Sequence, residues 1–237
     1  MTFHPSPFAP HGFFVTGTDT GVGKTLMACA LLHAFAARGA RVVGMKPVAA
    51  GARRTARGLR NDDVDRLVAA GNVTAPLAWI NPYCFEPPVA PHIAACAAGV
   101  AIELPRIANA CRELAAIADT VIVEGAGGFC VPLNARETTA DLAQSLGLPL
   151  LLVVGMRLGC LNHALLTAQA ARARGLVLAG WVANQIEPGM PYLDENIAAL
   201  EERLVAPCLA HVGFAPAADA RQVARLLDLG ALQGGGR

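Results

Sequence analysis

FFVTGTDTGVGKT, residues 13–25, joins a short apolar run to a glycine-bearing turn, which is followed by a segment of helical periodicity. Gly-Lys-Thr in a turn between a strand and a helix is the signature of a phosphate-binding loop, or P-loop. The backbone amides of such a turn point at phosphate oxygens, and the helix N-terminus adds partial positive charge. Five residues separate Gly17 from Gly23, where the common motif has four. The alternative is an ordinary glycine-rich turn, but Gly-Lys-Thr in this context favours the P-loop.

Two side chains of this loop have definite roles in a P-loop. Lys24 would reach the β and γ phosphates, and the hydroxyl of Thr25 would ligate magnesium. ATP and Mg²⁺ are therefore the expected cofactors. The loop residues expected to bind the nucleotide are Asp19, Thr20, Gly21, Val22, Gly23, Lys24 and Thr25.

Outward from the loop, short apolar runs alternate with longer segments of helical period, which is typical of parallel strands joined by helices. Gly39, Gly147 and Gly175 follow three of the helical segments, at positions where a left-handed residue is favoured. The expected strands are 13–17, 41–45, 120–124, 150–154, 176–183 and 210–213. The expected helices are 25–38, 104–118, 139–146, 162–174, 194–204 and 219–229.

The predicted fold class is therefore α/β: one P-loop NTPase domain, residues 13–229, with a mostly parallel central sheet and helices on both faces. Residues 48–102 are less regular and are expected to decorate the sheet rather than extend it. Residues 1–12 are interpreted as a flexible leader and residues 230–237 as a disordered tail.

The composition argues against several classes of protein. The 237 residues are 54% apolar and 16% charged, and a net charge of +1 offers no basic stripe for nucleic acid. The apolar run 148–156 ends at Arg157 and is too short to cross a membrane, and residues 1–12 lack a secretory signal pattern. The seven cysteines show no C-x-x-C spacing. We expect reduced thiols in a cytoplasmic protein without nucleic-acid or membrane partners.

The lysines are unusual. Of 19 basic residues only Lys24 and Lys46 are lysine, which suggests that a compact ammonium is needed at both positions. Lys46 ends the second expected strand, at the sheet edge where ligands of open parallel sheets bind. A surface lysine beside Pro47 is the alternative interpretation.

Acidic residues provide candidate metal ligands. Glu124 closes a buried strand and precedes a loop with Gly125, Gly127 and Gly128, which we expect beside the nucleotide. In NDDVD, residues 61–65, either Asp62 or Asp63 is a possible ligand or a helix cap, and the spacing does not choose between them.

Three further polar positions are ambiguous when read alone. Asn162, beside His163, is interpreted best as the cap of the next helix. Asn184 ends a strand and would either contact a purine edge or close a turn. His92 follows a proline and has no partner visible in the sequence.

Other segments stand in a definite order along the chain: 45–49 (MKPVA), 58–61 (GLRN), 81–83 (NPY), 91–93 (PHI), 123–128 (VEGAGG), 158–163 (LGCLNH) and 180–184 (GWVAN). Together with the P-loop and its additional residue, these segments resemble the dethiobiotin synthase family over roughly residues 13–214. Single segments occur in wider P-loop relatives, but the ordered set is specific to this family.

The resemblance implies an ATP-dependent ligase of biotin biosynthesis that converts 7,8-diaminopelargonic acid and CO₂ to dethiobiotin, ADP and phosphate. One amine is carbamylated, ATP phosphorylates the carbamate to a carbamic-phosphoric anhydride, and the second amine displaces phosphate as the ring closes. Such a site must place cations where negative charge accumulates.

The resemblance also implies roles for particular residues. Lys24, Lys46 and Thr20 would be catalytic, with both ammonium groups at the carbamate. It selects Asp63 over Asp62, so the implied metal ligands are Thr25, Asp63 and Glu124. The implied substrate-binding residues are Thr20, Lys46, Leu158, Gly159, Cys160 and Asn162.

The loop 158–162 would hold the substrate carboxylate across a homodimer interface, and Asn184 would contact adenine. Three positions depart from common family choices, namely Gly21, Ala50 and Asn196. These departures bear on substrate affinity more than on reaction type.

A partitioning-type regulatory ATPase, which works as a nucleotide-driven switch, is the alternative function. Such proteins usually carry an additional lysine early in the P-loop, and this loop has none. The stretch 226–237 also lacks a basic amphipathic face. The sequence therefore favours the ligase.

Overall fold

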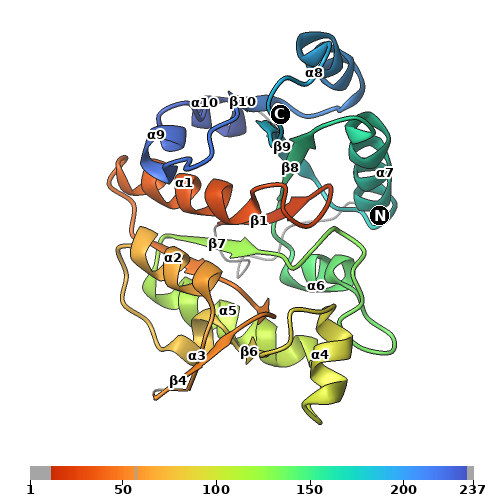
Figure 1. The fold of residues 1–237 in the computed structure, drawn as a ribbon. Coiled ribbons are helices and arrows are strands. Elements are labelled where there is room, and N and C mark those ends of the chain that lie inside the picture. Colours follow the sequence, from red (N-terminus) through yellow and green to blue (C-terminus); the bar gives the residue numbers. More distant parts are fainter. Residues whose placement is uncertain (1–11, 57, 234–237) are drawn as a thin grey trace.

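The computed structural model describes residues 12–56 and 58–233, and its centre is a six-stranded sheet with the order β10-β9-β8-β1-β7-β2 (Figure 1). All five neighbouring pairs in this sheet are parallel, as predicted. The strands are β1 (Gly12–Gly17), β2 (Val42–Met45), β7 (Thr120–Glu124), β8 (Leu150–Met156), β9 (Leu178–Gln185) and β10 (Cys208–Val212).

Helices cover both faces of the sheet, which confirms the predicted α/β architecture. Side chains alternate between the faces, so Phe14 packs toward one set of helices and Val15 toward the other. One face carries α5 (Leu104–Ile117), α6 (Thr139–Leu146), α7 (Cys160–Ala173) and α8 (Leu193–Arg203). The other carries α1 (Lys24–Ala36), α2 (Asp62–Ala70), α9 (Ala220–Ala224) and α10 (Leu229–Gln233).

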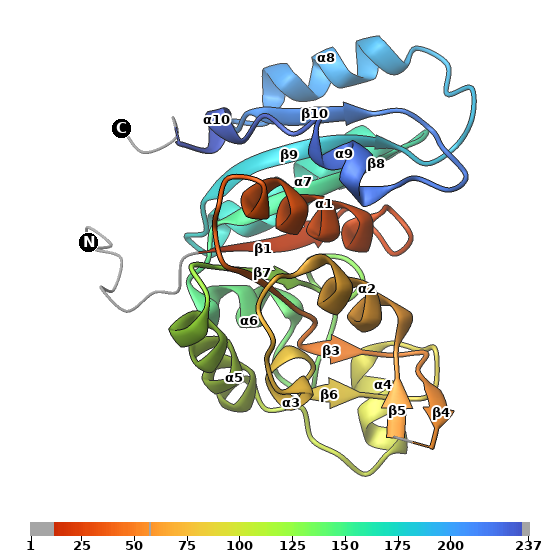
Figure 2. The ribbon, with the colours of Figure 1, turned by 90° about the vertical axis from the view of Figure 1, so that its left-hand side faces the viewer.

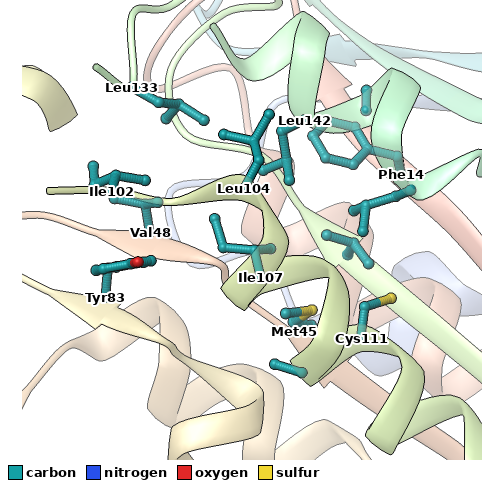
Figure 3. Packing of buried hydrophobic residues seen from close by; sticks show 14 of the residues in the cluster. Phe14, Met45, Val48, Tyr83, Ile102, Leu104, Ile107, Cys111, Leu133 and Leu142 are labelled. Carbon is teal, nitrogen blue, oxygen red and sulfur yellow. The ribbon is translucent and has the colours of Figure 1, made fainter. Parts of the chain in front are cut away.

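Apolar burial holds α5 and α6 on the sheet. Ile107 and Cys111 of α5, Leu142 of α6, Met45 of β2 and Phe14 of β1 belong to one buried cluster (Figure 3). All five side chains are at most 1% exposed, so this layer is a packed core that keeps the strand ends in place.

Residues 48–102 decorate the sheet, as predicted. They form two small sheets beside the central one (Figure 2), a parallel pair and an antiparallel pair. The elements are β3 (Val48–Ala49), β4 (Arg53–Thr55), β5 (Gly58–Arg60), α2, α3 (Leu77–Ile80), β6 (Tyr83–Cys84) and α4 (Pro91–Ala97).

The predicted helix 219–229 is wrong, because the structure divides it into α9 and α10. Asp228 interrupts the helix: its backbone amide donates to the Leu209 carbonyl at 2.8 Å, and its carboxylate accepts from the amide of Gly230 at 2.9 Å. Part of the predicted tail, 230–233, is consequently helical, and 234–237 lie outside the described residues. Gly12, the last residue of the expected leader, begins β1, and residues 1–11 also lie outside them.

Other features agree with the sequence. Gly39, Gly147 and Gly175 all have positive φ after their helices. The seven cysteines all fall in the described part of the chain and are free thiols. None of the helices in the ranges 12–56 and 58–233 is both long and apolar enough to span a membrane.

Candidate active site

The candidate site lies at the carboxyl ends of the parallel strands, around the turn between β1 and α1. Gly21 and Gly23 of this turn have φ of 76° and 96°, values that favour glycine. Gly23 occupies the N-cap position of α1, so the helix N-terminus opens directly onto the turn. The predicted strand, turn and helix are therefore present.

The side chain of Lys24 folds back onto the P-loop. It donates to the carbonyl oxygen of Asp19 at 2.7 Å, and Lys24 is only 7% exposed. Burial, with a smaller contribution from the positive charge of Lys46, lowers the pKa of Lys24 to about 8. Because the charge of Lys46 lowers the pKa of Lys24, the two ammonium groups are close enough to repel each other.

Lys46 is buried at the end of β2 and forms ion pairs with two carboxylates. Its ammonium lies 2.5 Å from Oε1 of Glu124 and 3.2 Å from Oδ2 of Asp63. Burial disfavours the charge of Lys46, but the two carboxylates outweigh burial and raise its pKa. The surface-lysine interpretation is wrong, because this ammonium is inside a charged cluster.

The structure distinguishes Asp63 from Asp62. Asn61 caps α2 by accepting from the amides of Asp63 and Val64, so neither aspartate is the cap. Asp62 is exposed and pairs with Arg53, whereas Asp63 faces Lys46. Burial opposes the charge of Asp63, yet Lys46 lowers its pKa.

Glu124 joins the P-loop to Lys46. Its Oε1 accepts from the hydroxyl of Thr25 at 2.7 Å, while its Oε2 is buried and has no hydrogen-bond partner among residues 12–56 and 58–233. A buried carboxylate oxygen without a partner is costly unless a cation or donor binds it. Thr25, Asp63 and Glu124 are hard oxygen ligands, so the residues present fit Mg²⁺.

The glycine loop after β7 approaches the P-loop closely, as expected. A Cβ placed on Gly127 would lie 3.6 Å from the hydroxyl of Thr20, and one on Gly128 would lie 3.8 Å from the carbonyl oxygen of Gly17. The amide of Gly125 donates to the carbonyl of Val15 at 3.0 Å. These contact distances show that the two loops lie next to each other.

Asn184 holds the P-loop from the end of β9. Its buried amide nitrogen donates to the carbonyl oxygen of Val22 at 2.8 Å, and a Cβ on Gly23 would lie only 2.4 Å from that nitrogen. This contact closes the P-loop against the sheet. A carboxamide has two N–H donors and an acceptor oxygen, so the remaining groups of Asn184 are available to a base.

Comparison with known proteins identifies the family. A family model described as an AAA domain matches residues 11–222. The ATP-dependent dethiobiotin synthetase BioD of Nitrosospira multiformis is 58% identical over 92% of this chain and 95% of its own length. The protein of the same name from Aromatoleum aromaticum is 55% identical over 93% of this chain and 98% of its own. The chain belongs to the dethiobiotin synthetase family.

Solved structures outside the dethiobiotin synthetases share the fold. A ParA family ATPase from Chlorobium tepidum has a TM-score of 0.52 and 16% identity, covering 96% of this chain and 93% of that one. The MinC:MinD cell division protein complex of Aquifex aeolicus has a TM-score of 0.52 and 14% identity, covering 87% and 82%. Identities this low show a shared fold and nothing about function. Because the close relatives are dethiobiotin synthetases, the switch-ATPase alternative is not favoured.

The loop that the dethiobiotin synthetase resemblance links to the substrate carboxylate is largely exposed. Leu158 is 98% exposed, and Gly159 and Asn162 are exposed as well. Cys160, the first residue of α7, is only 2% exposed, and its side chain packs in the core. Only its backbone is therefore available to a ligand of this loop. Gly159, not Asn162, is the N-cap of α7, so the capping interpretation of Asn162 is wrong.

Arg157 is a site residue that sequence reasoning missed. Its guanidinium lies 2.6 Å from the carboxylate of Asp19, so it ties the loop before α7 to the P-loop. In the sequence Arg157 only marked the end of an apolar run. A charged residue at the carboxyl end of a buried strand was the signal that identified Glu124. The same signal would have identified Arg157, which directly follows β8.

Two histidines do not join the site. His163 is exposed in the first turn of α7. His92 lies in α4, where its Nδ1 is buried and has no hydrogen-bond partner in the described part of the chain.

Proposed function

We propose that this chain forms dethiobiotin from 7,8-diaminopelargonic acid, CO₂ and ATP. Family membership makes it an ATP-dependent ligase of biotin biosynthesis. The observation that carries the proposal is the cluster in which buried Lys46 contacts both buried Glu124 and half-buried Asp63, while Glu124 contacts Thr25 of the P-loop. This cluster places an ammonium and carboxylates beside a site for phosphates, as phosphorylation of an anion requires.

In the proposed reaction, one substrate amine adds to CO₂ and loses a proton, giving a carbamate. The carbamate oxygen attacks the γ-phosphorus of ATP, and the bond to the β,γ-bridging oxygen breaks to release ADP. The second amine then attacks the carbonyl carbon of the carbamic-phosphoric anhydride, loses a proton and expels phosphate. A cyclic urea results.

Lys24 and Lys46 neutralise the anions that must approach each other in this reaction. Lys24 moves from the Asp19 carbonyl to the phosphates and the carbamate, while Lys46 holds the carbamate and Thr20 contacts the substrate. Both ammonium groups are buried, which strengthens their interaction with bound anions. Their charge is needed most as the phosphoryl group is transferred.

Thr25, Asp63 and Glu124 are the proposed Mg²⁺ ligands. When bound, the ion neutralises phosphate charge and orients the triphosphate. Lys46 pairs with both proposed ligand carboxylates, so its ammonium would be free to face the carbamate when these carboxylates hold the ion.

We propose that the substrate carboxylate is bound by the amides of Leu158, Gly159 and Cys160 and by the side chain of Asn162 from the partner copy in a homodimer. Amides at the start of α7 suit a carboxylate because the helix N-terminus is partially positive. Asn184 contacts adenine with its remaining amide groups. A cytoplasmic location accords with the free thiols.

The decisive experiment is product analysis. Purified protein with ATP, Mg²⁺, the diamine and ¹³C-bicarbonate is expected to produce labelled dethiobiotin, detected by mass spectrometry, with one ADP released per product. Omitting the diamine or bicarbonate is expected to abolish ATP turnover. Turnover at full rate without both would contradict the ligase and favour the switch ATPase.

A further inference from the structure

Three potential metal ligands gather at the edge of the sheet, where two strands, β9 and β8, separate β10 from the P-loop strand β1. Glu201 comes from α8, and Cys208 and His211 come from β10, the edge strand. The three donor atoms all lie within 4.8 Å of one another, and Nε2 of His211 is 3.6 Å from Oε1 of Glu201. No step of the proposed ligase reaction uses this cluster.

A β-bulge brings Cys208 and His211 together. Residues three apart on a regular strand point to opposite faces. In the pairing of β10 with β9, however, Cys208 lies opposite Trp181 and His211 opposite Ala183, because one additional residue is inserted between Cys208 and Ala210. Trp181 and Ala183 are two apart and point to one face, so Cys208 and His211 share that face.

Core packing agrees with this register. Leu209 and Ala210 both pack on the opposite face, against the α1 layer, as expected where the alternation is interrupted. Cys208 packs instead against the layer that contains Trp181 and α8. The bulge therefore turns the thiol toward α8.

The helix supplies the third ligand. Ile197 and Leu204 anchor α8 and the residue that follows it to the same core layer. Glu201, one turn beyond Ile197, is placed at the rim of this layer beside β10, and α8 runs alongside β10 in Figure 2. Its carboxylate is half exposed, so an ion can enter from solvent.

We propose that Glu201, Cys208 and His211 bind a divalent ion of the zinc class. Thiolate, imidazole and carboxylate are the ligands that Zn²⁺ prefers, and three protein ligands leave the fourth tetrahedral position to water. The ion would cross-link α8 and β10. Without it, the half-exposed pair between Glu201 and His211 adds little to stability.

Co²⁺ is the probe, because it replaces Zn²⁺ in tetrahedral sites and shows a charge-transfer absorption only with a thiolate ligand. Nucleotide-free and magnesium-free protein titrated with Co²⁺ is expected to show this absorption, and Zn²⁺ is expected to remove it. Cys208→Ser should abolish it, and His211→Gln and Glu201→Gln should each weaken Co²⁺ binding at least about tenfold. The matched controls Cys130→Ser and His33→Gln should leave it unchanged.

Thermal unfolding provides a second readout. Zn²⁺ is expected to raise the unfolding temperature of the wild type by a few degrees and to have no effect on Cys208→Ser. If Cys208→Ser does not fold, the variants at Glu201 and His211 carry the test. An absent absorption, one that survives Cys208→Ser, or one that neither His211→Gln nor Glu201→Gln weakens would overturn the proposal.

Discussion

Lys46 lies between the two carboxylates that are proposed to bind magnesium, so its ammonium and the ion compete for the same oxygens. Among residues 12–56 and 58–233, Oε2 of Glu124 has no hydrogen-bond partner, so this oxygen would be open to a cation while Lys46 still pairs with Oε1. In the proposed mechanism, this exchange would couple nucleotide binding to the release of Lys46 toward the carbamate. Three predictions test the residues involved.

Lys46→Arg is expected to fold and bind ATP but to lose dethiobiotin formation by about a hundredfold or more, the usual loss when one group that stabilises transition-state charge is displaced. The planar guanidinium keeps the ion pairs with Glu124 and Asp63, yet it is too large for a compact ammonium site. Product formation measures the loss, and calorimetry measures ATP affinity. Wild-type kcat in this variant would remove Lys46 from the mechanism.

Asp63→Asn is expected to raise the Mg²⁺ concentration needed for half-maximal activity by about tenfold or more, since even outer-shell changes cost that much. Asp62→Asn is the matched control, because Asp62 is adjacent, is exposed and faces Arg53. Its Mg²⁺ requirement should equal that of the wild type. Equal shifts in both variants would contradict the assignment of Asp63.

ATP affinity is expected to fall as pH rises above about 8. The free protein loses the Lys24 proton near pH 8, whereas bound phosphates raise the Lys24 pKa, so binding takes up a proton above that pH. Below pH 8 the ammonium is charged in both states and the affinity should be flat. Calorimetry in buffers of different ionisation enthalpy measures the uptake. Lys24→Met should bind weakly and lack this pH dependence.

At the scale of elements, the turn before α1 combines two constraints on one residue. Gly23 has positive φ, and the amide of Asn184 occupies the space where a side chain would begin. The N-terminus of α1 points at the phosphates only while the turn keeps this shape. The register of β9 against β8 fixes the position of Asn184. Two strands far from the P-loop in sequence therefore determine the geometry of the P-loop.

Gly23→Ala is expected to weaken ATP binding at least about tenfold, equivalent to about 1.4 kcal/mol. Gly39→Ala is the matched control, because Gly39 also has positive φ but has open space around its Cβ position. The control should lose about 1 kcal/mol of folding stability with unchanged ATP affinity. Isothermal calorimetry and urea unfolding separate the two effects. Equal ATP affinity in both variants would show that the Asn184 contact is unimportant.

At the scale of the whole molecule, the largely exposed 158–162 loop is the proposed contact with a second copy. Leu158 is almost fully exposed at the start of α7, while Arg157 next to it is tied to the P-loop. A second copy would cover this leucine and complete the substrate site. The proposed site is therefore composite, with the P-loop from one copy and Asn162 from the other.

Asn162→Ala is expected to lose dethiobiotin formation, as Lys46→Arg does, and mixing the two variants is expected to restore activity. In a symmetric dimer with shared sites, half of the randomly mixed dimers contain one intact site of two, giving about a quarter of wild-type activity. Each variant alone is the control. A mixture no more active than its components would place the whole site within one copy.

The sequence alone determined the six strands of the central sheet and the order of the helices between them, but not the small elements of residues 48–102. The P-loop, the alternation of apolar runs with helical segments and the acid that closes β7 are local patterns, and local patterns reflect backbone geometry and burial. They predicted the parallel sheet and the helices on both faces, whereas the family was predicted by the resemblance of an ordered set of segments. They did not predict the break at Asp228, because that break depends on a contact with Leu209 on β10.

Only the tertiary structure decided which side chains meet. Thr25 and Glu124 are 99 residues apart, and Arg157 and Asp19 are 138 apart, so their contacts depend on strand order and register. Adjacent Asp62 and Asp63 are equivalent in the local pattern, and the orientation of α2 turns Asp63 toward Lys46 and Asp62 toward Arg53. The bulge in β10 has no local signal either, because a bulge is defined by the partner strand.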